Sequence, residues 1–258
     1  MAENQARLIL SSQTCKRFFD AATIACFTVL IGTNISGAQS VNVKSIRSWD
    51  AEIALGGNFS TGNTDRKALD IDAKASHRNG PFEDHYRLSG EFVREKDKTT
   101  AARINGKAQS NYDISNRFYA LGFAEVERDK FSGFRYETEI ALGLGYRIIN
   151  MEQLSLEIEL APAFRHGAIK AGGNNNKMFA RGSAMLEYNI SDTATLTNES
   201  AVSGQSGQFR AENTLALTAT LVSSLAARIS FNIRYNSHPP ARIKKTDTIS
   251  KVQLVYGF

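Results

Sequence analysis

The segment RYETEIALGLGYRII, residues 135–149, alternates between apolar and polar side chains. One set of alternate positions runs from Tyr136 to Tyr146 and is mainly apolar, whereas the other carries Glu137, Glu139 and small or basic residues. A period of two predicts a β-strand, because successive side chains of a strand point to opposite faces. The apolar face has the length that a tilted strand needs to cross a bilayer, about 9–11 residues, and aromatic residues stand near both ends.

The same alternation recurs along most of the chain. Between Leu225 and Tyr235 the odd-numbered residues are apolar, and the even-numbered ones are mostly polar and include Arg228 and Arg234. Counting such segments predicts about twelve strands, at residues 48–59, 67–77, 84–94, 101–112, 117–127, 135–148, 153–165, 177–189, 193–203, 209–221, 225–236 and 246–258.

The connections between these segments alternate in length. Tight turns such as NISDT (residues 189–193) alternate with longer links such as RHGAIKAGGNNNK (residues 165–177). Short turns on one side and longer loops on the other are typical of bacterial outer-membrane barrels, and an even strand number returns both ends to the periplasm. The sequence therefore predicts an all-β protein with a single antiparallel transmembrane β-barrel of about twelve strands, preceded by a cleaved signal peptide.

One segment fits this alternation poorly. In residues 117–127, Leu121, Phe123, Glu125 and Glu127 share one face, so apolar and acidic side chains point the same way. The strand expected there is the least regular of the twelve.

Whole-chain averages agree with a barrel. The 258 residues carry a net charge of +5 and have a mean hydropathy of −0.30, which is the value of a soluble protein. After residue 40 there is no apolar run of about 18 residues, so a helical membrane protein is excluded for the mature part. A barrel escapes such averages because only every second residue faces lipid.

The first 38 residues have the pattern of an export signal. Arg7, Lys16 and Arg17 precede a short apolar run, and Ser36 to Ala38 supply small residues before the expected cleavage point. We therefore expect a signal peptide at 1–38, a short periplasmic lead-in at 39–47 and the barrel domain at 48–258. The alternatives are an uncleaved membrane anchor or a lipoprotein cut before Cys26.

Cleavage would remove both cysteines of the chain, Cys15 and Cys26. The mature chain would then have no disulfide framework and no cysteine-ligated metal. Its net charge would be +4, without the basic cluster expected of a nucleic-acid-binding protein.

The start of the predicted barrel resembles a known family. Trp49 is followed by a glycine-bearing strand and by STGNT, which includes Ser60, Gly62, Asn63 and Thr64. This pattern resembles the salt-induced outer membrane protein family (YdiY-like), whose members carry domain of unknown function 481, and the resemblance extends over about residues 48–258. It implies an outer-membrane barrel of a Gram-negative bacterium without an assigned activity, and the family label suggests osmotic or salt adaptation.

The STGNT motif suits a turn between two strands, since Gly and Asn tolerate positive φ and Ser and Thr can bond the local backbone. A role in binding a ligand is the alternative. At the other end, VQLVYGF places Tyr256 and Phe258 at alternate positions, and it resembles the C-terminal signal that the barrel-assembly machinery reads. Outer-membrane lipid and lipopolysaccharide are the other expected partners.

Catalysis is not expected. The four histidines, His77, His85, His166 and His238, fall at strand ends or in loops, and no G-x-S-x-G motif accompanies them. No metal-ligand spacing recurs, and no cofactor is expected. The alternative is an enzyme acting on lipid or lipopolysaccharide with His166 at the outer rim. A purely structural or adhesive barrel would instead use the loops at 167–177 and 237–246.

Charges on the predicted inner face suggest the function. The candidates are Glu137, Glu139, Glu157, Glu159, Arg210, Arg228 and Arg234. Opposed acidic and basic walls would orient a small polar solute in a narrow channel. Alternatively, these groups pair with one another and fill the interior, because a barrel of about twelve strands is intermediate in width. The sequence leaves both possibilities open.

Overall fold

A computed structural model of the chain describes residues 49–60, 66–95, 98–205, 207–238 and 245–257. The predicted signal peptide (1–38), the lead-in (39–47), the motif residues Gly62, Asn63 and Thr64, and the terminal Phe258 lie outside this part. Among the described residues, no helix is long and apolar enough to cross a membrane.

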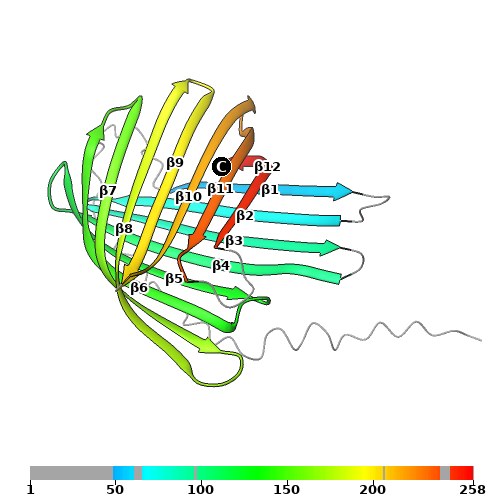
Figure 1. Cartoon of the computed structure of the whole chain (residues 1–258). Coiled ribbons are helices and arrows are strands. Elements are labelled where there is room, and N and C mark those ends of the chain that lie inside the picture. The colour runs from blue at the N-terminus through cyan, green and yellow to red at the C-terminus, as the bar shows by residue number, and fades with distance from the viewer. Residues whose placement is uncertain (1–48, 61–65, 96–97, 206, 239–244, 258) are drawn as a thin grey trace, which may run out of the picture. The chain divides into compact units, whose positions relative to one another are not determined.

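The described chain forms twelve antiparallel strands (Figure 1). They are β1 (Trp49–Ser60), β2 (Arg66–Asn79), β3 (Phe82–Glu95), β4 (Lys98–Asp113), β5 (Phe118–Asp129), β6 (Phe134–Asn150), β7 (Leu154–Ile169), β8 (Asn174–Ser191), β9 (Ala194–Gln205), β10 (Gln208–Val222), β11 (Leu225–Asn236) and β12 (Thr246–Gly257). Each strand pairs with the next, and β12 pairs with β1 to close the barrel. The predicted barrel of about twelve strands is confirmed.

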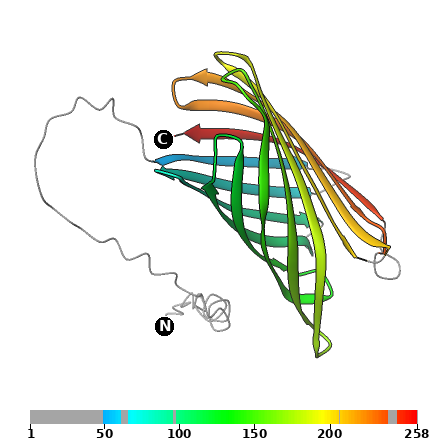
Figure 2. The same cartoon turned by 90° about the vertical axis from the view of Figure 1, so that its left-hand side faces the viewer.

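The start of β1 and the end of β12 lie at the same end of the barrel (Figure 2), which we call the terminal end. The opposite end, where β1 stops and β2 begins, is the loop end. Several connections at the loop end are shorter than the sequence predicts. The predicted link at 165–177 is mostly strand, because β7 and β8 pair from Phe164↔Met178 out to Ala168↔Asn174. Backbone pairing continues there beyond the last apolar side chains of the outer face. In that region the sequence no longer alternates between apolar and polar residues, so the alternation does not predict a strand.

The outer face of the wall is apolar and the inner face is polar. In β6, Ile140, Leu142 and Leu144 are exposed on the outside, and Leu142 is 74% exposed. Aromatic pairs mark both ends of this apolar face. They are Phe82–Tyr112 and Phe118–Tyr146 near the terminal end, and Phe209–Tyr235 near the loop end. Such a band with aromatic borders is characteristic of strands that face lipid.

The closing contact between β1 and β12 is short. Between described residues it comprises five pairs, from Glu52↔Gly257 to Gly56↔Gln253, whereas every other pair of neighbouring strands has at least ten. We call this contact the seam. At its last pair the strands approach closely, since a Cβ on Gly56 would lie 2.9 Å from the carbonyl oxygen of Val252.

Two ion pairs inside the barrel cross the seam. Arg228 of β11 reaches over β12 and donates to both carboxylate oxygens of Glu52 in β1, at 2.9 and 2.8 Å. Lys251 of β12 reaches over β1 to Asp70 of β2. Side chains therefore supplement the short backbone ladder.

The irregular strand at 117–127 has a structural explanation. β5 turns Tyr119, Leu121 and Phe123 inward, where they are buried against the small residues Ala141, Ala161 and Ala163. This interior cluster fills part of the lumen beside β5 to β7 near the terminal end. The apolar and acidic residues of β5 share the inner face of the strand. The first part of that face packs in the interior cluster, and the later part borders the polar lumen.

The seam yields the first testable prediction. Replacing Arg228 by Gln should lower the free energy of unfolding by about 1.5–3 kcal/mol, because Glu52 loses a bidentate charged donor in a half-buried site. Urea unfolding followed by the fluorescence of Trp49, the one tryptophan of the chain, measures this. Arg128→Gln is the matched control, since Arg128 is exposed and shares the outward parity of Val126. Equal stability of Arg228→Gln and wild type would show that the backbone ladder alone holds the seam.

The interior cluster yields a second prediction. A Cβ on Gly145 would collide with the ring of Tyr119, so Gly145→Ala should destabilise the barrel by about 1–3 kcal/mol through overpacking. The control is Gly122→Ala, whose Cβ would lie 3.6 Å from Leu142 in ordinary contact. This control should be neutral or stabilising by about 0.4–1 kcal/mol. The same unfolding measurement compares the two, and an equal effect of both changes would refute the packing argument.

Candidate functional site

The barrel encloses one large cavity, with a volume of about 1030 Å³. Its lining extends from Asp50 and Ser224 near the terminal end to Glu91 and Arg234 towards the loop end. Eleven of the twelve strands contribute to it, so the cavity is the lumen of the barrel.

Carboxylates outnumber basic groups along this lining. The twelve carboxylates are Asp50, Glu52, Asp72, Glu83, Glu91, Glu125, Glu127, Glu157, Glu159, Glu187, Glu199 and Glu212. The seven lysines and arginines are Lys74, Arg87, Arg103, Lys107, Arg181, Arg234 and Lys251. The described residues thus give the lumen an acidic excess, although the whole chain has a net positive charge.

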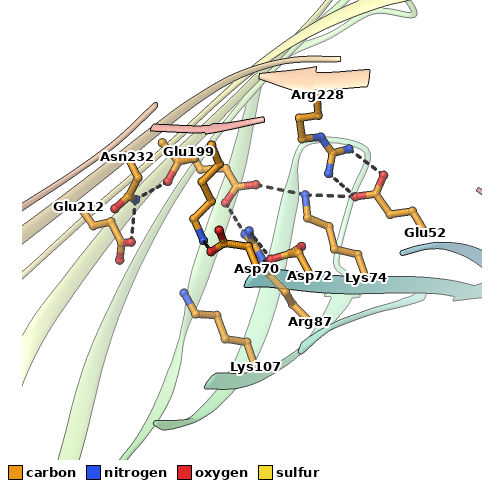
Figure 3. A network of polar contacts seen from close by, with 12 residues as sticks. Glu52, Asp70, Asp72, Lys74, Arg87, Lys107, Glu199, Glu212, Arg228 and Asn232 are labelled. Carbon is orange, nitrogen blue, oxygen red and sulfur yellow. Dashed lines mark hydrogen bonds and ion pairs between the residues drawn. The ribbon is translucent and has the colours of Figure 1, made fainter. Parts of the chain in front are cut away.

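An ion pair joins opposite walls of the barrel (Figure 3). Arg87 of β3 donates to Glu199 of β9 at 3.2 Å, and five strands lie between β3 and β9 in either direction round the barrel. Lys74 of β2 also approaches Glu199, at 3.8 Å, and Arg87 is anchored to Asp72 on the neighbouring strand at 2.9 Å. We call the contact of Arg87 and Lys74 with Glu199 the lumen bridge. It narrows the passage between the two walls.

Further polar contacts link the lumen bridge to the seam. Lys74 lies 3.6 Å from Glu52, which is the partner of Arg228. On the far side, Asn232 donates to Glu212, and Arg234 pairs with the same carboxylate at 2.9 Å. Figure 3 shows polar side chains converging on the lumen from β1, β2, β3, β9, β10 and β11; among those it labels are Glu52, Lys74, Arg87, Glu199, Glu212, Arg228 and Asn232.

The wall formed by β5 to β8 carries a second set of pairs. Glu139 lies between Arg165, at 2.7 Å, and Arg181, at 3.5 Å. Tyr119 donates to Glu157 or Glu159, whose carboxylates lie at 2.9 and 3.0 Å from its hydroxyl. Three arginines also stack over inward aromatic rings, with guanidinium-to-centroid distances of 4.3–4.7 Å. The stacked pairs are Arg147–Tyr119, Arg165–Phe179 and Arg181–Phe123.

The structure places the predicted charge candidates on the inner side of the wall. Glu157, Glu159 and Arg234 line the cavity, and Arg228 and Glu139 contact groups that line it. Glu137 and Arg210 face each other at 3.8 Å nearer the loop end.

The candidate charges are partnered in two ways. Glu139 and Arg234 pair with charges on adjacent strands. Arg228 instead pairs over β12 with Glu52, and Glu137 of β6 pairs with Arg210 of β10. Glu139 is the register partner of Arg165, and Arg234 is that of Glu212. Parity along a strand gives the face of a residue, whereas its partner depends on the register between strands. The pairing matches the alternative of an internally paired interior, yet a large cavity remains.

Sequence reasoning missed two of the three residues of the lumen bridge, Arg87 and Glu199. Arg87 lies in a strand whose apolar and polar residues alternate regularly, so the alternation predicts that its side chain points inward. Glu199 lies in ATLTNESAVSGQ, where polar residues occupy both faces. Asn198, on the opposite face, hydrogen-bonds to Asn213 and Ser200. The contact between β3 and β9 has no local signal, because it depends on the shape of the closed barrel.

The remaining candidates lie away from the cavity. His166 is hydrogen-bonded to Asn176 at 2.7 Å, and its ring packs at a tilt against Tyr136. Ser60 ends β1, and Tyr256 of β12 pairs with Ile53 of β1. Within the described ranges, no group of three or more His, Cys, Asp or Glu residues is arranged to hold a metal ion.

Comparison with solved structures finds weak similarity to several barrels. NanC porin is 12% identical, with 81% of this chain and 97% of that chain covered and a TM-score of 0.47. KdgM porin in complex with disordered oligogalacturonate is 11% identical, with coverages of 81% and 99% and a TM-score of 0.44. The translocator domain of autotransporter NalP from Neisseria meningitidis is 13% identical, with coverages of 81% and 87% and a TM-score of 0.44.

A search of curated proteins finds no match. A protein family does match, over residues 53–258, which includes nearly the whole barrel. Its description is "Protein of unknown function, DUF481". The resemblance inferred from the STGNT region is thereby confirmed at the level of this family, and the chain belongs to the DUF481 family.

Proposed function

We propose that the protein is a narrow channel across the bacterial outer membrane that favours small cationic or polar solutes. The location is supported by the apolar outer face of the barrel with its aromatic borders, since such a surface is stable in lipid and costly in water. The export signal expected at residues 1–38 would deliver the chain to that membrane. Lipid and lipopolysaccharide would contact the apolar face, and the strand that includes Tyr256 would be recognised by the assembly machinery.

The acidic excess of the cavity lining carries the proposal. Twelve carboxylates face seven lysines and arginines in a lumen of about 1030 Å³. Rings of carboxylates favour cations in aqueous pores, because the local potential raises cation concentration and lowers that of anions. Unpaired carboxylates in a dry interior would be costly, so this excess also requires that water fill the cavity.

The lumen bridge would control how freely solutes pass. Its atoms lie 3.2 and 3.8 Å apart, and its side chains are about one third exposed, so the attraction is open to screening by salt. The Debye length falls from about 10 Å at 0.1 M to about 3 Å at 1 M ionic strength. Higher salt should therefore weaken the bridge and widen the passage. A channel of this kind could serve salt or osmotic adaptation, which is the role that the family label suggests.

Replacing Glu199 by Gln tests the channel and its bridge together. An exposed ion pair contributes about 0.2–1 kcal/mol, so the ratio of open to bridged states should rise by up to about fivefold. In planar bilayers, wild-type conductance should increase more steeply between 0.1 and 1 M salt than bulk conductivity does. The Glu199→Gln variant should conduct more at 0.1 M and should lose the extra steepness.

The matched control is Glu187→Gln, which removes a carboxylate from the cavity lining outside the bridge. It should reduce cation preference slightly, as measured by the reversal potential in a salt gradient, without changing the steepness. Absence of any conductance from the folded wild-type barrel would refute the channel. A wild-type preference for anions would refute the role assigned to the acidic lining.

A further inference from the structure

A small pocket lies at the loop end of the lumen, apart from the main cavity. It has a volume of about 100 Å³ and is formed by residues of β6 to β11. We call it the mouth pocket. Its size is about that of three water molecules at roughly 30 Å³ each, which suits a carboxylate with one or two attached carbons.

The mouth pocket has an excess of basic side chains. Among the described residues, Arg165, Lys177 and Arg210 line it together with a single carboxylate, that of Glu137. Arg165 is held by Glu139 at 2.7 Å, but Arg210 is 46% exposed and lies 3.8 Å from Glu137. Lys177 donates to the amide oxygen of Gln208 at 3.3 Å, and no carboxylate of the described residues pairs with it.

Neutral polar groups complete the pocket. Gln205 and Asn236 line it, and their amides can both donate and accept hydrogen bonds. Basic groups surrounded by amide donors form a favourable environment for an anion such as a carboxylate.

The sign of the charge changes from the mouth pocket to the main cavity. A solute entering at the loop end first meets three basic groups and one carboxylate, and then twelve carboxylates and seven basic groups. A simple anion is attracted at the first stage only, and a simple cation at the second stage only. A molecule with a carboxylate at one end and a cationic group at the other is attracted by both, with the cationic end leading.

We propose that the mouth pocket binds the carboxylate of small zwitterionic solutes and orients their cationic end towards the acidic lumen. This inference rests on the proposed channel, because it names the class of solute that the channel takes up. Lys177 and Arg210 hold the carboxylate, since their charges are the least compensated. The carboxylates of the main cavity attract the cationic end.

Four probes of similar length test the proposal by titration calorimetry on the detergent-solubilised barrel. They are γ-aminobutyrate, butyrate, butylammonium and the neutral butyramide. We expect γ-aminobutyrate to bind most tightly. The double variant Lys177→Gln/Arg210→Gln should weaken its binding by about tenfold or more, which corresponds to the loss of one charge-assisted contact.

Two further variants serve as controls. Lys177→Arg keeps the charge and should bind as the wild type does. Arg128→Gln removes a positive charge from the outer face and should leave binding unchanged. Equal binding of butyrate and γ-aminobutyrate would overturn the proposal, as would an unchanged affinity in the double variant or an equal loss in Arg128→Gln.

Conductance of the same wild-type preparation separates this inference from the proposed function. Binding as expected without conductance would leave the zwitterion site standing and would refute the channel. Conductance with γ-aminobutyrate binding that is insensitive to the double variant would support the channel and refute the zwitterion site.

Discussion

The structure depends on one constraint, which is that every strand must find a hydrogen-bonding partner on both edges. Lipid offers no donors or acceptors, so a sheet in a bilayer is stable only when its backbone ladder closes on itself. The antiparallel order of twelve strands with β12 beside β1 satisfies this requirement. Closure divides the side chains into two sets. Those outside are apolar with aromatic borders, and those inside are free to be polar because the wall shields them from lipid.

The same division explains how so many charges can be placed in the interior. Burying an isolated charge is costly, whereas a charge with a partner and access to water is tolerated. Charged partners are present, as in the ion pairs Arg228–Glu52 and Arg165–Glu139. The large cavity leaves room for water beside such charges. The surplus of carboxylates then becomes a property of the whole lumen rather than of one site. The interior cluster around Tyr119 fills part of the lumen and leaves the polar side open.

Much of this architecture is readable from the sequence because a strand has a period of two. Strand positions, the face of each residue and the even strand number all follow from local alternation, as in residues 135–149. The partner of a residue is not local. Glu139 meets Arg165 through strand register, and Arg87 meets Glu199 through the shape of the closed barrel. In β9 the alternation does not identify Glu199 as an inward residue, because Asn198 makes the outer face polar as well. Asn198 is accommodated there by a hydrogen bond to Asn213. β5 departs from the pattern because its inner face is partly apolar.

The brevity of the seam bears on the order in which the barrel folds. All other strand contacts join neighbours in sequence through short connections, so they form as local hairpins with little loss of chain entropy. The seam joins Glu52 to Gly257 and has the highest sequence separation of any pairing. Long-range pairing is intrinsically slow, and here it gains five pairs between the residues that the structure describes. Hairpins should therefore accumulate first as an open, curved sheet, with ring closure as the last and slowest event of maturation.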